Sequence, residues 1–210
     1  MIEHRVFVKE VENRMGMRLL QHDGRLYVRF VGGLALPGLH PGYSVLIGEE
    51  ATHRKPFPCK VLWEFESNDP YQLIEKVSIE EQKYQATFYG DRERAAPFIR
   101  HHNEVARREE RESFSIAEAP FLEEGNLSSH LHALNAALAP GNKYLFFGPE
   151  SDLTERLMQV STHEVHKLKA RDNPAVAALG YAFSIIALYQ SNEPRPAEMA
   201  ITEYDTQRYS

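Results

Sequence analysis

The sequence has only one cysteine, Cys59, and it lacks an excess of positive charge. A single cysteine excludes an internal disulfide framework and suits a reducing compartment, so we expect a cytoplasmic protein. Lysine and arginine number 24 against 30 aspartates and glutamates, which gives a formal net charge of −6. This balance argues against a protein that holds nucleic acid by bulk charge. It does not argue against an enzyme whose carboxylates bind divalent metal ions.

Long apolar runs are scarce as well. The longest, residues 174–189, is shorter than the roughly 20 residues that a spanning helix needs. The N-terminal segment 1–14 is charged and alternates polar with apolar residues, unlike a signal peptide. We therefore expect no membrane association, and we expect residues 174–189 to form a helix that is buried on most of its faces.

The periodicity of the apolar residues predicts strands first, and then strands alternating with helices. The expected strands are 4–11, a hairpin within 17–33 that turns at Asp23-Gly24, 43–50, 59–67, 83–89, 113–119 and 143–148. The expected helices lie within 68–82, 92–111, 127–138, 151–161 and 174–189, and a loop rich in glycine and proline is expected at 32–42. This order predicts an α/β protein with a mixed sheet and helices on both faces.

Three regions are expected along the chain. Residues 1–66 are β-rich and form either a small barrel or the first strands of the sheet. Residues 67–191 form the α/β domain, and residues 192–210 form a polar tail that is interrupted by proline.

Asp91 stands where strand 83–89 ends and helix 92–111 begins. In open α/β sheets, ligands collect beyond the carboxyl ends of the strands, and Gly90 allows the backbone to turn tightly there. Aspartate is also one of the best residues for capping the N-terminus of a helix. Asp91 is therefore either a helix cap or a metal-binding carboxylate, and the two roles are compatible. We expect its strand to lie inside the sheet.

Asp172 precedes Asn173-Pro174 and the apolar helix. Asp172 or Asn173 can cap this helix, with Pro174 in the first turn, where the missing N–H costs nothing. The helix would also carry its N-terminus to the edge of the core, where Asp172 could face Asp91. Two converging carboxylates repel each other, and Mg²⁺ or Mn²⁺ relieves that repulsion through its oxygen ligands.

Three stretches in the second half of the chain follow a recognisable order. Residues 86–99, ATFYGDRERAAPFI, run from a strand through an acid into a helix. Residues 127–161 contain a helix, a strand and a helix that begins Asp-Leu, and residues 170–188 place an acid before an apolar helix. Together they resemble the nuclease domain of phage DNA-packaging terminase large subunits, which has a ribonuclease-H-like fold.

This resemblance implies a set of acidic residues that bind Mg²⁺ or Mn²⁺ and act in catalysis: Asp91, Asp172 and Glu50. Glu50 follows a glycine by two positions in VLIGEEAT, similar to the family's Gly-x-Asp-x-Ala, although the strand count places it in the second strand. Strand 25–33 has no acid at its centre. Asn173 and Ala177 stand where the family has further acids, and the chain has no phosphate-binding loop of an ATPase domain.

Three hypotheses for the function remain open. The chain is a metal-dependent endonuclease that hydrolyses DNA, or a catalytically degenerate relative that acts in phage DNA packaging through contacts with DNA, a motor or a capsid protein. The third is a non-catalytic α/β module for protein–protein interaction or assembly. The strand-end position of Asp91 favours the first hypothesis, whereas the thin acidic set and the lack of a basic patch favour the others. We expect a weakly active or degenerate nuclease-like domain.

Overall fold

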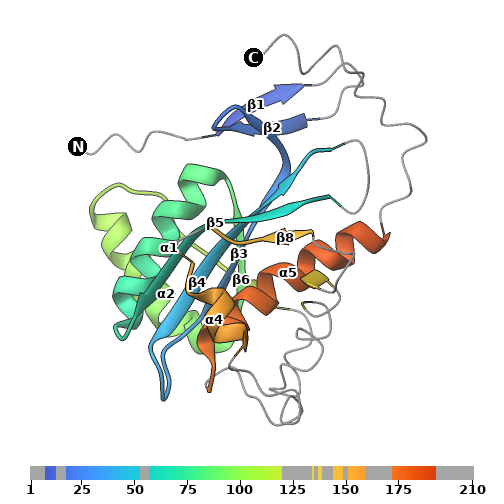
Figure 1. Ribbon diagram of the computed structural model, residues 1–210. Helices are drawn as coiled ribbons and strands as arrows, with labels where there is room; N and C mark the ends of the chain where they lie inside the picture. The colour runs from blue at the N-terminus through green and yellow to red at the C-terminus, as the bar shows by residue number, and fades with distance from the viewer. Residues whose placement is uncertain are drawn as a thin grey trace.

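The computed structural model describes residues 8–12, 18–52, 57–119, 134, 137–138, 144–148, 151–158 and 172–192 (Figure 1). Its strands are β1 (Lys9–Glu12), β2 (Arg18–His22), β3 (Arg25–Ala35), β4 (Gly42–Glu50), β5 (Cys59–Ser67), β6 (Thr87–Gly90), β7 (Ala117–Glu118) and β8 (Leu145–Phe146). Its helices are α1 (Pro70–Tyr84), α2 (Arg92–Arg108), α4 (Leu153–Met158) and α5 (Pro174–Asn192). The polar tail and most of the expected helix 127–138 lie outside the described residues.

In the described part of the chain the strands form one mixed sheet. Its order is β1-β2-β3-β4-β5-β8, with β6 beside β3 and β7 beside β6. The first five strands pair antiparallel with their neighbours, whereas β6 is parallel to β3, β7 to β6, and β8 to β5. The predicted α/β class and mixed sheet are confirmed. Strands β3 to β5, from the β-rich N-terminal region, belong to the same sheet as the later strands.

The hairpin between β2 and β3 turns at Asp23-Gly24, as the sequence predicted. Both residues have positive φ, 48° at Asp23 and 74° at Gly24. Two-residue hairpins favour this conformation because its twist matches that of the flanking strands. The turn sets the register that pairs His22 with Arg25.

The predicted loop at 32–42 is wrong in its first part, because β3 continues to Ala35. Gly32 and Gly33 are strand residues. At each of them a neighbouring residue occupies the space that a side chain would take. A Cβ on Gly32 would lie 2.2 Å from the ring of Phe88, and a Cβ on Gly33 would lie 1.8 Å from the carbonyl oxygen of Ala178. These glycines mark close packing on the two faces of the strand rather than a turn.

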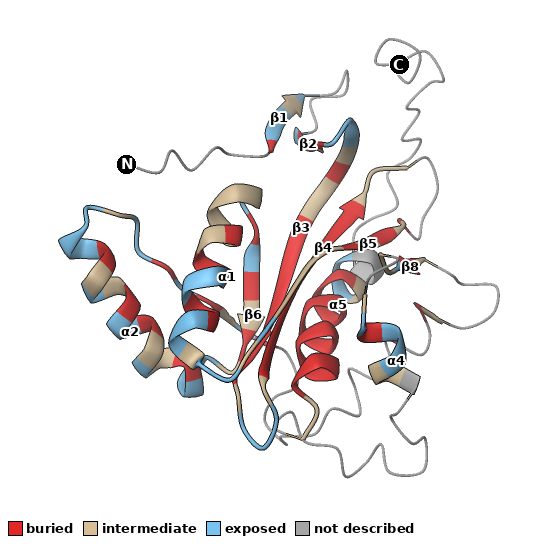
Figure 2. Cartoon of the chain, turned by 60° about the vertical axis from the view of Figure 1, so that its left-hand side comes forward, coloured by how far each residue is buried: buried red, intermediate tan, exposed pale blue. Residues whose placement is uncertain are grey.

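The buried apolar residues form two clusters that draw on alternating positions of β3. Val31 and Ala35 belong to the cluster that contains α5, whereas Phe30 and Leu34 belong to the cluster that contains residues of α1 and α2. Figure 2 shows α1 and α2 on one side of the strands and α5 on the other. The period-two alternation of a strand explains the division, because successive side chains point to opposite faces.

Helix α5 covers its face of the sheet and is buried along most of its length. Leu179, Phe183 and Ile186 have 0% exposure, which confirms the predicted burial of this apolar helix. Near the C-terminal end of α5, the ring centroid of Tyr189 lies 4.3 Å from the guanidinium of Arg29. The same guanidinium is paired to the buried carboxylate of Glu49 at 2.8 Å. None of the helices in the described part of the chain combines the length and apolarity of a membrane span.

The two ends of α1 confirm one local prediction and shift another. The sequence predicts Asn68 or Asp69 as the cap, with Pro70 in the first turn. Asp69 is the cap, and it accepts a hydrogen bond from the N–H of Tyr71 at 2.9 Å. The strand predicted at 83–89 begins only at Thr87, because α1 continues to Tyr84. Gln85 then ends the helix with a left-handed φ of 51°.

We predict that Gly33→Ala destabilises the protein by about 3 kcal/mol or more, because the added methyl group would overlap backbone rather than a movable side chain. Gly148→Ala is the matched control, since a Cβ there meets nothing within 4 Å. It should change the free energy of unfolding by less than about 0.5 kcal/mol. Urea denaturation measures both. Equal stability of the two variants would contradict the close contact between β3 and α5.

Candidate functional site

The carboxyl ends of the parallel strands β3, β6 and β7 meet at one edge of the sheet. In the register, Leu34 of β3 is opposite Gly90 of β6, and Gly90 is opposite Glu118 of β7. Strand β6 therefore lies between two neighbours, as expected for the strand that precedes Asp91. Gly90 allows the close approach there, since a Cβ on it would lie 2.5 Å from the carbonyl oxygen of Leu34.

Asp91 caps α2. Its Oδ1 accepts a hydrogen bond from the backbone N–H of Arg94 at 2.9 Å, and its backbone is extended (φ −74°, ψ 94°). This geometry satisfies one of the N–H groups that the first turn of a helix leaves without a partner. The capping role that the sequence predicted for Asp91 is thus confirmed, and it leaves the second carboxylate oxygen for another contact.

Glu118 is a second carboxylate at the same helix end, and the sequence analysis missed it. Its Oε2 accepts a hydrogen bond from the backbone N–H of Arg92 at 3.2 Å. The positive end of the α2 dipole favours both Glu118 and Asp91 in this position. The signal that could have revealed Glu118 is its place at the end of the expected strand 113–119, one parallel strand beyond Asp91.

Tyr181 of α5 completes the group of ionisable residues at this edge. It is 1% exposed. Burial raises its pKa, the charges of Asp91 and Glu118 raise it further, and the guanidinium of Arg94 acts in the opposite direction. Tyr181 also lines a cavity together with Asp91, so α5 reaches the strand edge, as expected for a helix that lies beside Asp91. At neutral pH Tyr181 is a neutral hydroxyl next to two carboxylates.

A small cavity lies among these side chains. Its volume is about 20 Å³, and its lining includes Asp91, Arg94 and Tyr181 together with Leu34, Ala35, Leu36 and Ala95. A cavity of this size has room for about one water molecule. The side chain of Arg94 also donates a hydrogen bond to the carbonyl oxygen of Pro37, which fastens the loop after β3 to α2. The cavity is apolar on its β3 side and charged on its α2 side.

Glu50 lies at the opposite end of the sheet. It pairs with Tyr27 in the register between β4 and β3, whereas Leu34 is the residue of β3 that faces Gly90. Seven residues along a strand correspond to about 23 Å. The carboxylate of Glu50 is bound to Arg25 at 3.0 Å. The structure therefore does not bring Glu50 and Asp91 together, because β4 runs antiparallel to the strands that end at the candidate site.

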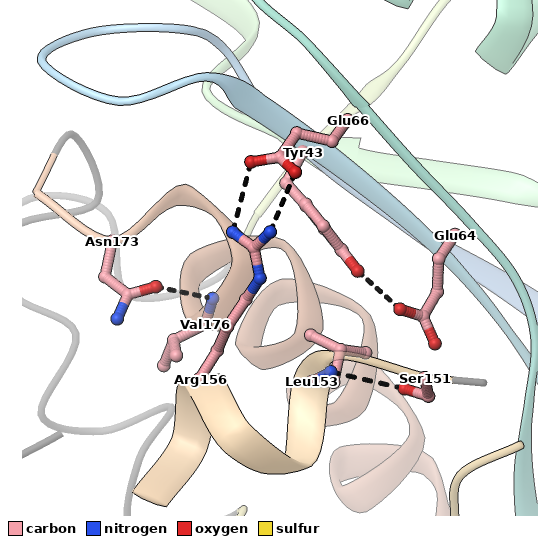
Figure 3. A network of polar contacts seen from close by, with 8 residues as sticks. All are labelled: Tyr43, Glu64, Glu66, Ser151, Leu153, Arg156, Asn173 and Val176. Atoms are coloured by element: carbon pink, nitrogen blue, oxygen red, sulfur yellow. Dashed lines mark hydrogen bonds and ion pairs between the residues drawn. The ribbon is translucent and has the colours of Figure 1, made fainter. Parts of the chain in front are cut away.

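Asp172 stands two residues before the start of α5, and Asn173 between them caps the helix. Asn173 Oδ1 accepts a hydrogen bond from the N–H of Val176 at 3.2 Å (Figure 3). Within α5, the pKa of Tyr181 is raised by burial and by the charge of Asp91. Among the described residues, no group of three His, Cys, Asp or Glu side chains could hold a metal ion.

A polar network joins α4 to the sheet next to the start of α5 (Figure 3). Arg156 makes two hydrogen bonds to Glu66, at 3.1 and 2.7 Å, and its guanidinium lies 5.2 Å from the ring centroid of Tyr43. The hydroxyl of Tyr43 donates to Glu64, and burial together with this hydrogen bond raises the pKa of Tyr43. These groups are mutually paired and fix α4 on β4 and β5, which is a structural role.

Comparison with solved structures identifies a similar fold, whereas comparison of sequences finds no match. No protein-family model and no curated protein matches the chain. The structure of the large terminase from a thermophilic bacteriophage is similar to it, with a TM-score of 0.50 and 13% identity over 76% of this chain and 40% of that chain. The same terminase in complex with ATP-gamma-S has a TM-score of 0.49 and 15% identity, over 75% and 40% of the two chains. At this identity the first match shows a terminase-like fold alone, in a chain that spans 40% of the terminase.

We predict that Asp91→Ala lowers the free energy of unfolding by about 1 kcal/mol, whereas Asp91→Asn changes it little, because asparagine caps a helix nearly as well as aspartate. Glu104→Ala, at an exposed position of the same helix, should cost less than about 0.5 kcal/mol. Chemical denaturation at pH 7 measures all three. If asparagine destabilised as much as alanine, the charge of Asp91 rather than its capping geometry would be the stabilising feature.

Proposed function

We propose that the chain is a ribonuclease-H-like domain related to the nuclease domain of phage large terminases, and that its acidic site is incomplete. The strand order β5-β4-β3-β6-β7 supports this proposal. Three antiparallel strands, a helix, a strand that ends in an acid, a second helix and a further parallel strand follow one another as the family resemblance implies. Helix α5 corresponds to the closing helix of that resemblance.

The observation that carries the proposed degeneracy is the absence of an acid from β3. The resemblance implies an acid on the first strand, but β3 has none at its centre, and Leu34, Ala35 and Leu36 at its carboxyl end line the cavity beside Asp91. Mg²⁺ and Mn²⁺ need oxygen ligands, and two ions need several carboxylates placed between them. The apolar end of β3 supplies no side-chain oxygen, and the cation of Arg94 opposes a metal ion on the other side of the cavity.

These residues do not fit a two-metal centre, because they provide too few carboxylates to hold two ions. Asp91 and Asp172 are proposed as the remaining members of the acidic set, able to bind at most a weakly held Mg²⁺ or Mn²⁺ ion. Glu50 is not proposed as a member, because it is bound to Arg25 at the far end of the sheet. The domain would then keep the fold without efficient cleavage of DNA.

The proposed role is assembly or nucleic-acid processing in phage DNA packaging. The fold shared with a large terminase supports that context. The net charge of −6 favours a protein partner, such as a packaging motor or capsid protein, over a long contact with DNA, because each phosphate repels a negative surface. A protein–protein interaction module with the same fold is the alternative, and it shares this preference for a protein partner.

The proposal predicts little or no cleavage of supercoiled plasmid DNA in Mg²⁺ or Mn²⁺, with no difference between wild type and Asp91→Asn. It also predicts that Mn²⁺ raises the melting temperature only slightly through binding to the native state. Asp91→Asn should remove that rise. Glu93→Gln, which changes an exposed carboxylate two residues away, should leave it unchanged. Gel electrophoresis and thermal melts measure these outcomes. Metal-dependent nicking that disappears in Asp91→Asn would identify an active nuclease and overturn the degeneracy.

A further inference from the structure

Helices α1 and α2 pack together on the face of the sheet opposite α5 (Figure 2). An open cleft of about 900 Å³ is lined by both helices. The apolar side chains of Ile79 and Val105 line it together with the carboxylates of Asp69, Glu75 and Glu109. The cleft is separate from the cavity at Asp91, which lies on the edge of the sheet and shares none of these residues.

A second cleft, of about 730 Å³, is lined by the last turn of α1 and by residues that follow α1 and α2. Both clefts include Glu110 and Arg111 in their lining, so they adjoin there, and we call the two together the α1–α2 groove. The described lining of this groove contains one guanidinium, Arg111, and six carboxylates: Asp69, Glu75, Glu81, Glu109, Glu110 and Glu112. The groove is therefore strongly acidic.

The negative charge of the groove is only partly neutralised within the chain. Arg111 is paired to Glu109 at 2.6 Å. Burial and the neighbouring charge of Glu112 raise the pKa of Glu81 to about 7. A raised carboxyl pKa means that the folded protein holds this negative charge at a cost above pH 7, and a cation placed there would remove part of that cost. The C-terminal ends of both helices lie near this part of the groove and add partial negative charge.

An exposed aromatic ring stands near the other end of the groove. Tyr71 is 50% exposed and lines the first cleft. Its ring lies edge-on to Phe98, at 5.2 Å, and to His101, at 4.9 Å, so its position is fixed while one side stays open to solvent. The aliphatic stem and charged head of a lysine or arginine suit such a ring beside carboxylates.

We propose that the α1–α2 groove docks a segment of a partner protein that is rich in lysine and arginine. The carboxylates extend from the cap of α1 to beyond the end of α2, a distribution that matches a polycationic segment rather than a single ion. Helix α1 has 15 residues, so the groove is at least about 22 Å long. Electrostatic complementarity of this kind steers association and repels nucleic acid. This proposal does not depend on the proposed function, because none of its residues belongs to the site at Asp91.

The test measures binding of a fluorescein-labelled 14-residue amphipathic peptide, with lysine at its polar and leucine at its apolar positions, by fluorescence anisotropy at low salt. The groove variant is Glu75→Gln/Glu110→Gln. The matched control is Glu93→Gln/Glu104→Gln, which makes the same change in net charge at exposed positions of α2 outside the groove lining. We expect the groove variant to bind about tenfold more weakly, and the control to stay within about twofold of wild type. Thermal melts establish that both variants are folded.

Two further measurements complete the design. Binding of the peptide should weaken with added salt, since exposed charges are screened. A peptide with glutamate in place of lysine should not bind, because the groove would repel it. Equal losses in the groove variant and the control would mean that bulk charge alone attracts the peptide, and this would overturn the proposal. Absence of binding to wild type, or full binding by the groove variant, would overturn it as well.

Discussion

The close contact between Gly33 and Ala178 is the constraint on which the rest of the structure depends. A Cβ on Gly33 of β3 would lie 1.8 Å from the carbonyl oxygen of Ala178 in α5. The backbone of the helix therefore packs directly against the backbone of the strand. Such an approach needs small residues on both partners, and α5 supplies alanines at positions 175, 177, 178 and 182, all of them buried. Because helix and strand are this close, the position of α5 along β3 is narrowly defined.

That position decides what reaches the candidate site. With Ala178 packed on Gly33, Tyr181 reaches the cavity at the carboxyl end of β3. Burial and the charges of Asp91 and Glu118 raise its pKa there. The two carboxylates are held by the first N–H groups of α2. The edge therefore combines a helix dipole, two acids and a buried phenol. Asp91, Arg94 and Tyr181 line the cavity there, and the β3 side of that cavity is apolar. The first N–H groups of α2 bind one oxygen of each acid and thereby stabilise its negative charge.

The two faces of the sheet differ in how far their charged groups are paired within the chain. On the α5 face, small residues and aromatics fill the core, and among the described residues Arg29 is paired with Glu49 and Arg156 with Glu66. On the other face, α1 and α2 bury their apolar stripes against the sheet but leave an acidic groove on their outer side. Burial and, secondly, the charge of Glu112 raise the pKa of Glu81, so negative charge in this groove is costly. A surface of this kind is suited to a partner of opposite charge.

The sequence by itself determined the features whose chemistry lies within a few residues. The Asp23-Gly24 turn, the Asp69 and Asp91 caps and the buried helix after Pro174 follow from local backbone preferences and from apolar periodicity. Only the tertiary structure decided that Gly32 and Gly33 belong to a strand, that Glu118 lies beside Asp91, and that Glu50 lies at the opposite edge. Those outcomes depend on strand order and direction, which are fixed by contacts between distant segments. Local spacing carries no information about which strands become neighbours or at which edge their ends meet.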